Sequence, residues 1–243
     1  MTSKSAKVLA VAALAALPML ASAQLTANVS LTSNYKFRGQ DQDQSRTKTF
    51  KPAIQGGFDY AFGGTGFYVG NWNSSVDWLS GNSLESDVYG GYKFSSGALG
   101  FDVGVLAYLY PGNNFGNTTE LYGAVSYGPF TAKYSHTVSD GYFGVGKATD
   151  DGKGTGYLNL AYAQEVAKNV TLKASVGFTN FKAVTGAADY TDYSVGASYD
   201  FGGGVSLTGA VVGANKKASY PYAIDASKSV NKSALIVTLT KTL

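Results

Sequence analysis

The sequence predicts an all-β fold, a transmembrane antiparallel up-and-down β-barrel of about 12 strands. Its segments alternate between an apolar and a polar face over the length needed to cross a bilayer. Charged residues make up only 14% of the chain, against about 25% in an ordinary soluble domain, while there are 31 Gly and 18 Tyr. Short and long connections also alternate along the chain, as they do in barrels built from hairpins.

Residues 1–23 are predicted to be a cleaved secretory signal peptide. Lys4 and Lys7 precede a short apolar run over 8–17, and residues 21–23 read A-S-A, a typical cleavage pattern. A membrane anchor is the alternative, but the run is too short to span a bilayer. Residues 24–243 are then expected to form one barrel domain in the bacterial outer membrane.

The first strand after this peptide is predicted over 25–38. Its odd positions are mostly apolar and end in Tyr35 and Phe37, while its even positions are all polar and end in Lys36 and Arg38. Because side chains alternate across a strand, this ribbon separates two unlike media. A strand of a soluble, exported sandwich could look similar but is rarely this long.

The same pattern predicts the other strands. Segments 99–110, 170–181 and 190–201 each show one apolar face, whereas 66–77 is ambiguous because apolar residues occupy both of its faces. The predicted strands are 25–38, 50–61, 66–77, 85–94, 99–110, 119–127, 130–139, 156–165, 170–181, 190–201, 205–214 and 233–243.

The connections between these strands predict the orientation of the barrel. The short ones lie at 62–65, 95–98, 128–129, 166–169 and 202–204, and the long ones at 39–49, 78–84, 111–118, 140–155, 182–189 and 215–232. In bacterial barrels the short turns face the periplasm and the long loops face outward, so an even strand number places both chain ends on the periplasmic side.

Aromatic residues are expected to form two girdles at the membrane interfaces. The girdle near the short turns comprises Tyr60, Phe62, Phe67, Phe94, Phe101, Tyr127, Phe130 and Phe201. The girdle near the long loops comprises Tyr35, Phe37, Trp72, Trp78, Tyr110, Tyr157, Phe181, Tyr190 and Tyr220.

Composition excludes several kinds of chemistry. Without Cys there are no disulfides and no thiolate chemistry. The near-neutral charge and the lack of a basic stripe argue against a nucleic-acid partner. No cofactor or metal is expected, and the loop residues Asp41, Asp43, Asp150 and Asp151 are interpreted as solvated because they lack the spacing of a calcium loop.

If the apolar faces meet lipid, the charged side chains should line the interior, because a charge facing lipid near the midplane costs about 2–4 kcal/mol. They could pair and fill the lumen, or line a narrow wet channel, since twelve strands fall between filled and open barrels. Their mixed signs predict a weak ion preference. The predicted pore-lining residues are Lys36, Arg38, Glu85, Asp87, Lys93, Asp102, Glu120, Lys133, Glu165, Lys173, Asp192 and Asp200.

The one histidine, His136, follows Ser135 on a predicted strand. Adjacent side chains point to opposite faces of a strand, so these two cannot act as a nucleophile and its base. We therefore predict that the chain is not an enzyme.

Several segments resemble the TorF family, a proteobacterial outer-membrane family of unknown function described as porin-like. They read SNYKFRG at 33–39, PAIQGGFDY at 52–60, GFYVGNW at 66–72, ESDVYGGY at 85–92, YLYPG at 108–112 and ELY at 120–122. The resemblance implies an outer-membrane barrel and carries neither a substrate nor catalytic residues.

Together these observations predict a porin-like outer-membrane channel of a Gram-negative bacterium, through which small solutes or ions diffuse passively along a polar lumen. The alternative is a closed structural or surface-binding barrel without conductance. The expected partners are outer-membrane lipid, lipopolysaccharide, permeant solutes and the barrel assembly machinery. The oligomeric state is open, and a homo-oligomer is one outcome.

Overall fold

The computed structural model describes residues 24–43, 50–149, 151–182, 187–215 and 232–243. The predicted signal peptide, residues 1–23, lies outside the described residues. Within these ranges, no helix is long and apolar enough to cross a membrane.

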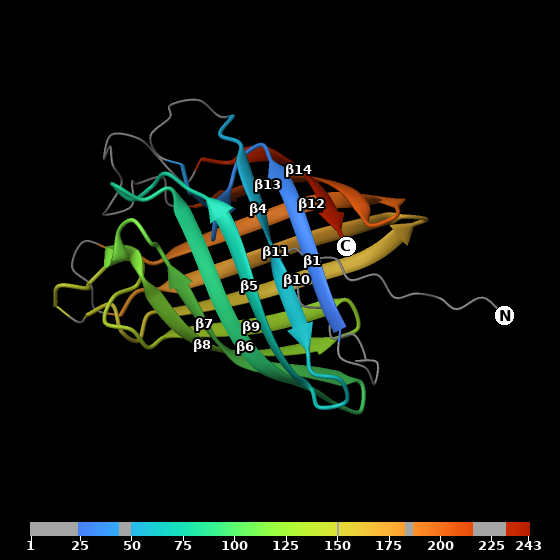
Figure 1. The fold of residues 1–243 in the computed structure, drawn as a ribbon, viewed down its shortest axis with the longest axis horizontal. Helices are drawn as coiled ribbons and strands as arrows, with labels where there is room; N and C mark the ends of the chain where they lie inside the picture. The colour runs from blue at the N-terminus through green and yellow to red at the C-terminus, as the bar shows by residue number, and fades with distance from the viewer. Residues whose placement is uncertain (1–23, 44–49, 150, 183–186, 216–231) are drawn as a thin grey trace.

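Twelve antiparallel strands close into one barrel, which confirms the predicted fold class (Figure 1). Neighbours in sequence pair with one another, and β1 closes the ring by pairing with both β4 and β14. The barrel strands are β1 (Gln24–Thr32), β4 (Ala53–Ala61), β5 (Phe67–Ser75), β6 (Leu84–Ser96), β7 (Leu99–Leu109), β8 (Thr118–Tyr127), β9 (Phe130–Thr137), β10 (Gly156–Ala167), β11 (Val170–Asn180), β12 (Tyr190–Gly202), β13 (Val205–Ala214) and β14 (Ala234–Thr242).

The tight turns gather at one end of the barrel and the long connections at the other (Figure 1). Gly97 and Gly128 lie in two of the tight turns with φ of 59° and 55°, a conformation that glycine adopts without strain. Both ends of the barrel sequence, Gln24 and Thr242, lie at the short-turn end, because β1 begins there and β14 finishes there. The predicted alternation of loop lengths is therefore confirmed.

Along each barrel strand, successive side chains point alternately to the outside and to the inside of the barrel. On β1, Leu25, Val29 and Leu31 point outward and are 65%, 46% and 59% exposed, whereas Thr32 points inward and is buried. Outward Leu, Val, Ile and aromatic side chains recur on the other strands. We call this outer surface the apolar belt.

The first strand is shorter than predicted. β1 ends at Thr32 instead of continuing to residue 38, and the next residues form a small hairpin of β2 (Lys36–Phe37) and β3 (Gln40–Asp41). Arg38 and Gly39 have φ of 47° and 77°, so the backbone reverses there and cannot continue an extended strand.

Candidate functional site

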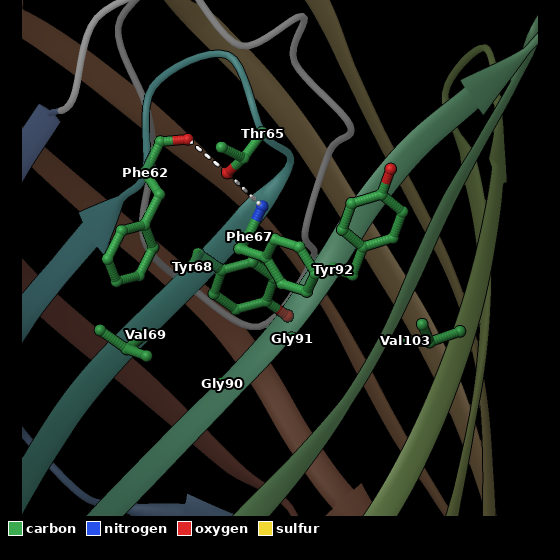
Figure 2. Close-up of a pocket in the computed structure, with 9 residues that line it drawn as sticks. All are labelled: Phe62, Thr65, Phe67, Tyr68, Val69, Gly90, Gly91, Tyr92 and Val103. Atoms are coloured by element: carbon green, nitrogen blue, oxygen red, sulfur yellow. Dashed lines mark hydrogen bonds between the residues drawn. The ribbon is translucent and has the colours of Figure 1, made fainter.

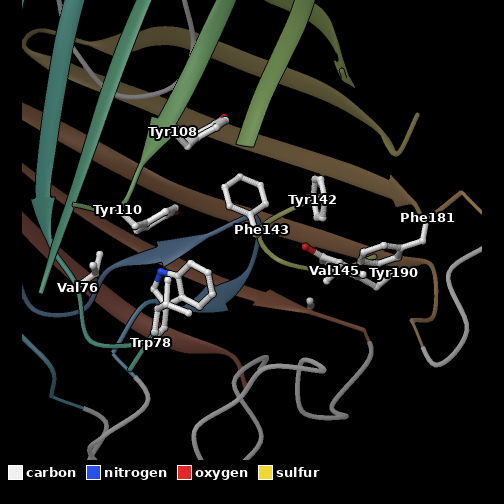
Figure 3. Packing of buried hydrophobic residues seen from close by; sticks show 11 residues of the cluster. Val76, Trp78, Tyr108, Tyr110, Tyr142, Phe143, Val145, Phe181 and Tyr190 are labelled. Atoms are coloured by element: carbon white, nitrogen blue, oxygen red, sulfur yellow. The ribbon is translucent and has the colours of Figure 1, made fainter. Parts of the chain in front are cut away.

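The barrel interior is filled at its long-loop end by buried aromatic and aliphatic side chains (Figure 3). Tyr110, Tyr142 and Val145 are each only 1% exposed. The β2–β3 hairpin packs here through Phe37, whose ring lies 5.5 Å from that of Tyr108. The buried cluster comprises Val76, Trp78, Leu79, Tyr108, Tyr110, Tyr142, Phe143, Val145, Phe181, Tyr190 and Ala214. We call this cluster together with residues 33–43 the plug.

The plug corrects the predicted girdle near the long loops. Trp78, Tyr110, Phe181 and Tyr190 are buried in the plug instead of facing lipid, because the long connections turn inward and their rings pack against one another. Tyr220 lies outside the described residues. Of the girdle predicted near the short turns, Phe67, Tyr127, Phe130 and Phe201 are more than half exposed on the outer face, and Tyr60, Phe62 and Phe94 are exposed to a lesser degree.

Arg38 connects the plug to the barrel wall. Its Nη1 and Nη2 donate to the two carboxylate oxygens of Glu120 on β8, at 2.9 and 2.7 Å, and Nη1 also donates to the Tyr142 hydroxyl at 2.9 Å. The guanidinium lies 4.0 Å from the centre of the Tyr157 ring. Burial alone would lower the pKa of Arg38, but attraction to Glu120 raises it well above its ordinary value.

A second group of charges lies within the hairpin. Asp41 accepts from Lys36 Nζ at 2.8 Å and from Lys51 Nζ at 3.1 Å, and also from the Asn34 side chain. Burial lowers the pKa of Lys36, against the attraction of Asp41, which raises it. The prediction that Asp41 is solvated is therefore wrong, because the hairpin folds into the barrel; Asp150 lies outside the described residues.

The carboxylates of β6 and β12 line the long-loop half of the interior. Glu85 accepts hydrogen bonds of 3.0 Å from the hydroxyls of Tyr35 and Tyr110. Asp87, also buried, has one carboxylate oxygen without a hydrogen-bond partner among the described residues. Asp192 accepts a hydrogen bond from the Tyr157 hydroxyl at 3.3 Å. Tyrosine hydroxyls are therefore the donors to Glu85 and Asp192, and nothing in the local sequence links these tyrosines to the acids.

The short-turn half of the interior contains a lysine–tyrosine group. Lys93 Nζ lies 4.5 Å from the Tyr68 ring centre, and Lys133 Nζ lies 4.0 Å from that of Tyr122. The two tyrosine hydroxyls bond to each other, and that of Tyr68 donates to Asp102 at 2.6 Å. Asp102 lies between Lys93 and Lys133 in the strand register.

Lys173 faces the same half of the interior from β11, and its Nζ is enclosed without a hydrogen-bond partner among the described residues. Lys93, Lys133 and Lys173 each lie four positions from a short turn. In the part of the chain that the structure describes, none of the three forms an ion pair.

The remaining predicted pore-lining residues lie at the short-turn rim. Glu165 accepts the Asn169 backbone N–H at 3.1 Å, and Asp200 accepts that of Gly202 at 2.7 Å. Both carboxylates thus satisfy turn donors, a common role for such side chains at chain reversals.

The interior wall formed by β11, β12 and β13 carries small side chains. Inward positions of these strands hold Ser175, Ser194, Gly196, Thr208 and Ala210, all of which are partly exposed. The larger tyrosines and most ionic groups stand on β5 to β10. The partial exposure of these inward side chains shows that solvent reaches this wall of the interior.

His136 and Ser135 point to opposite faces of β9. Ser135 is buried inside the barrel, while His136 is exposed outside, with its Nδ1 3.3 Å from the Tyr134 hydroxyl. Among the residues described, no group of three or more His, Asp or Glu side chains is arranged to hold a metal ion.

Comparison with known proteins places this barrel among porin-like folds. The family model described as "Bacterial protein of unknown function (Gcw_chp)" matches residues 19–243. No curated protein matches the chain significantly. The KdgM porin, solved in complex with disordered oligogalacturonate, is similar with a TM-score of 0.53 at 10% identity, over 89% of this chain and 97% of that one. The NanC porin is similar with a TM-score of 0.53 at 9% identity, over 90% and 98% of the two chains.

Proposed function

The chain belongs to Gcw_chp, a bacterial protein family of unknown function, and from its barrel we propose that it is a porin-like channel of the outer membrane. One observation carries the proposal: apolar side chains cover the outside of a closed barrel while ionisable ones point inward. Soluble proteins rarely expose apolar surface this extensive. In lipid, by contrast, a closed barrel lets every strand pair its backbone N–H and C=O groups with a neighbouring strand.

The proposed location in the outer membrane also includes the route of export, the orientation of the barrel and its partners. The predicted signal peptide would deliver the chain to the periplasm, and the short turns would stay on that side. The segments that resemble the TorF family support the same porin-like assignment. Outer-membrane lipid, lipopolysaccharide and the barrel assembly machinery are its proposed partners.

The proposed route for solutes enters at the short-turn end beside the small-residue wall. There Lys93, Lys133 and Lys173 lack ion pairs among the described residues, while the acids in the long-loop half bond to tyrosines and to Arg38. The same half also holds the carboxylates of Asp102, Glu165 and Asp200, so the charges along the proposed route are mixed and support the weak ion preference that composition suggests. The plug narrows the route at the other end.

The closed, non-conducting barrel is the second candidate, and the packing of the plug favours it. Side chains such as Tyr110 and Tyr142 are almost fully buried there, and the Arg38–Glu120 pair holds the hairpin against the wall. In this case the long loops would serve as a binding surface.

Single-channel recording of the refolded protein in planar bilayers discriminates between the two. Stepwise currents, together with swelling of liposomes in small solutes, support the channel. If the wild type is silent but a variant with a released plug conducts, the closed barrel is favoured. If both stay silent although the barrel is folded and inserted, the channel proposal is wrong.

A further inference from the structure

The outer face of β5 interrupts the apolar belt. Tyr68 and Trp72 point inward, so the alternate residues Asn71, Asn73 and Ser75 occupy outward positions. This resolves the ambiguous faces of segment 66–77. Four outward polar side chains form what we call the amide patch: Asn71, Asn73 and Ser75 on β5 and Ser86 on β6.

The amide patch lies at the depth of the apolar belt. One row across the sheet runs from Val29 through Gly56 to Asn73, and continues through Ser86 to Leu109. Val29 and Leu109 at its two ends are outward and 46% and 37% exposed.

Exposed aliphatic residues also lie beyond the patch on its long-loop side, where Ile54 and Leu84 flank Ser75. The patch is therefore surrounded by side chains suited to lipid.

Hydrogen bonds within the amide patch satisfy only part of it. Asn73 Nδ2 donates to Asn71 Oδ1 at 2.5 Å, and Asn71 Nδ2 donates to Ser86 Oγ at 3.3 Å and to a backbone carbonyl. Ser75 Oγ accepts the Ile54 N–H. Among the described residues, Asn73 Oδ1 has no donor, and the hydroxyl protons of Ser75 and Ser86 have no acceptor. Lipid tails can supply neither.

We infer that the amide patch is the contact through which a second copy of this chain docks, forming a two-fold dimer in the membrane; the inference rests on the proposed membrane location. Across a two-fold axis, the unpaired acceptor Asn73 Oδ1 of each copy can meet an unpaired hydroxyl donor, Ser75 or Ser86, of the other copy. A second copy inserts to the same depth and so presents the same groups at the same level. Gly56 in the same row lets the two walls approach closely.

An apolar groove continues the amide patch toward the short turns (Figure 2). Gly90, four residues beyond Ser86 on β6, forms its floor, with Phe67 and Tyr92 beside it. A copy docked on the patch would cover this groove, so the contact combines a polar centre with an apolar flank. Such a contact resembles helix association in membranes, where small and polar residues gather at the interface.

Single cysteines test the dimer directly, because the chain has no Cys of its own. Ser86→Cys, in outer membranes treated with a mild oxidant, is expected to give a reducible band at twice the mass. Ala174→Cys, outward on the distant strand β11, is the matched control and is expected to stay monomeric. Adding Asn71→Leu and Asn73→Val to Ser86→Cys should reduce the dimer band about tenfold.

Two results would overturn the dimer. One is equal crosslinking at Ser86→Cys and Ala174→Cys, which would indicate random collision. The other is no crosslinking at either Ser86→Cys or a second variant, Ser75→Cys, in protein that is membrane-bound and shows the gel shift of a folded barrel. That second result would leave the channel proposal intact, whereas recovery of the protein in a soluble fraction would overturn both.

Discussion

Replacing Arg38 with alanine is expected to release the plug from the barrel wall. The substitution leaves the Glu120 carboxylate buried without its two guanidinium hydrogen bonds, in a place where its side chain is only 1% exposed. It also removes the guanidinium that lies over the Tyr157 ring. The hairpin of β2 and β3 then keeps its apolar contacts but loses its charged link to β8.

The magnitude follows from the burial of this pair. Removing one partner of a buried ion pair costs about 3–5 kcal/mol, because the other charge is left uncompensated. A loss of about 3 kcal/mol in plug docking would raise the released fraction by about 100-fold. Removing both charges in Arg38→Ala/Glu120→Ala should recover most of this loss, since no unpaired charge then remains buried.

Two measurements check this prediction: single-channel conductance and the free energy of unfolding by urea in lipid vesicles. Arg38→Ala should increase the open time and lower the unfolding free energy, and the double variant should come back toward the wild type. Lys147→Ala is the matched control. Lys147 Nζ donates to an exposed loop carbonyl and lies 5.8 Å from the centre of the Phe115 ring, so its loss should cost less than about 1 kcal/mol. If the effects of the two single substitutions simply add, the pair does not hold the plug and the reasoning fails.

Three further predictions concern the interior, the turns and the outer face. Lys133→Glu should lower the chloride-to-potassium permeability ratio measured from reversal potentials, because it inverts one unpaired charge in the short-turn half, whereas Lys153→Glu on an exposed loop should leave the ratio unchanged. In urea unfolding, Gly144→Ala should destabilise the barrel by about 1 kcal/mol more than Gly128→Ala. Both glycines have positive φ, so both substitutions strain the backbone. A Cβ at Gly144 would in addition lie 2.6 Å from the Phe115 ring, whereas Gly128 has open space around it. His136→Ala should leave any hydrolysis of lipid esters at the level of the wild type, and a loss of turnover in this variant would show that the chain is an enzyme.

The barrel itself could be predicted because its two signals are local. Alternation along β1 and β11 needs only neighbouring residues, and tight Gly turns mark where one strand ends and the next begins. Closure follows from the need to satisfy every strand edge in lipid.

The plug could not be predicted, because its contacts join residues far apart in sequence. Arg38 and Glu120 are separated by 82 positions, and nothing local pairs them. The alternation of apolar and polar residues continues through Tyr35 and Phe37, beyond the end of β1, because the β2–β3 hairpin has an apolar and a polar side as well. This is why the sequence predicted a longer first strand. The dipeptide Arg38-Gly39, where φ turns positive, was the one local sign of a reversal.

The interior could be predicted in part. The alternation of apolar and polar positions is enough to predict that Glu85, Asp87 and Lys173 point inward, and they do so in the structure. This alternation does not reveal which acids bond to tyrosines or which lysines stay unpaired, because those choices depend on the opposite wall.

The seam between β1 and β14 is the shortest junction in the cylinder. β14 pairs only with Asn28–Thr32 of β1, whereas β4 pairs with the whole of β1 from Gln24 to Thr32. Because β1 and β14 are the farthest apart in sequence of any two paired strands, their pairing closes the longest loop and costs the most chain entropy. Mechanical force or denaturant should therefore separate β1 from β14 before any other pair of neighbouring strands. An engineered lateral opening of the barrel would be placed between these two strands.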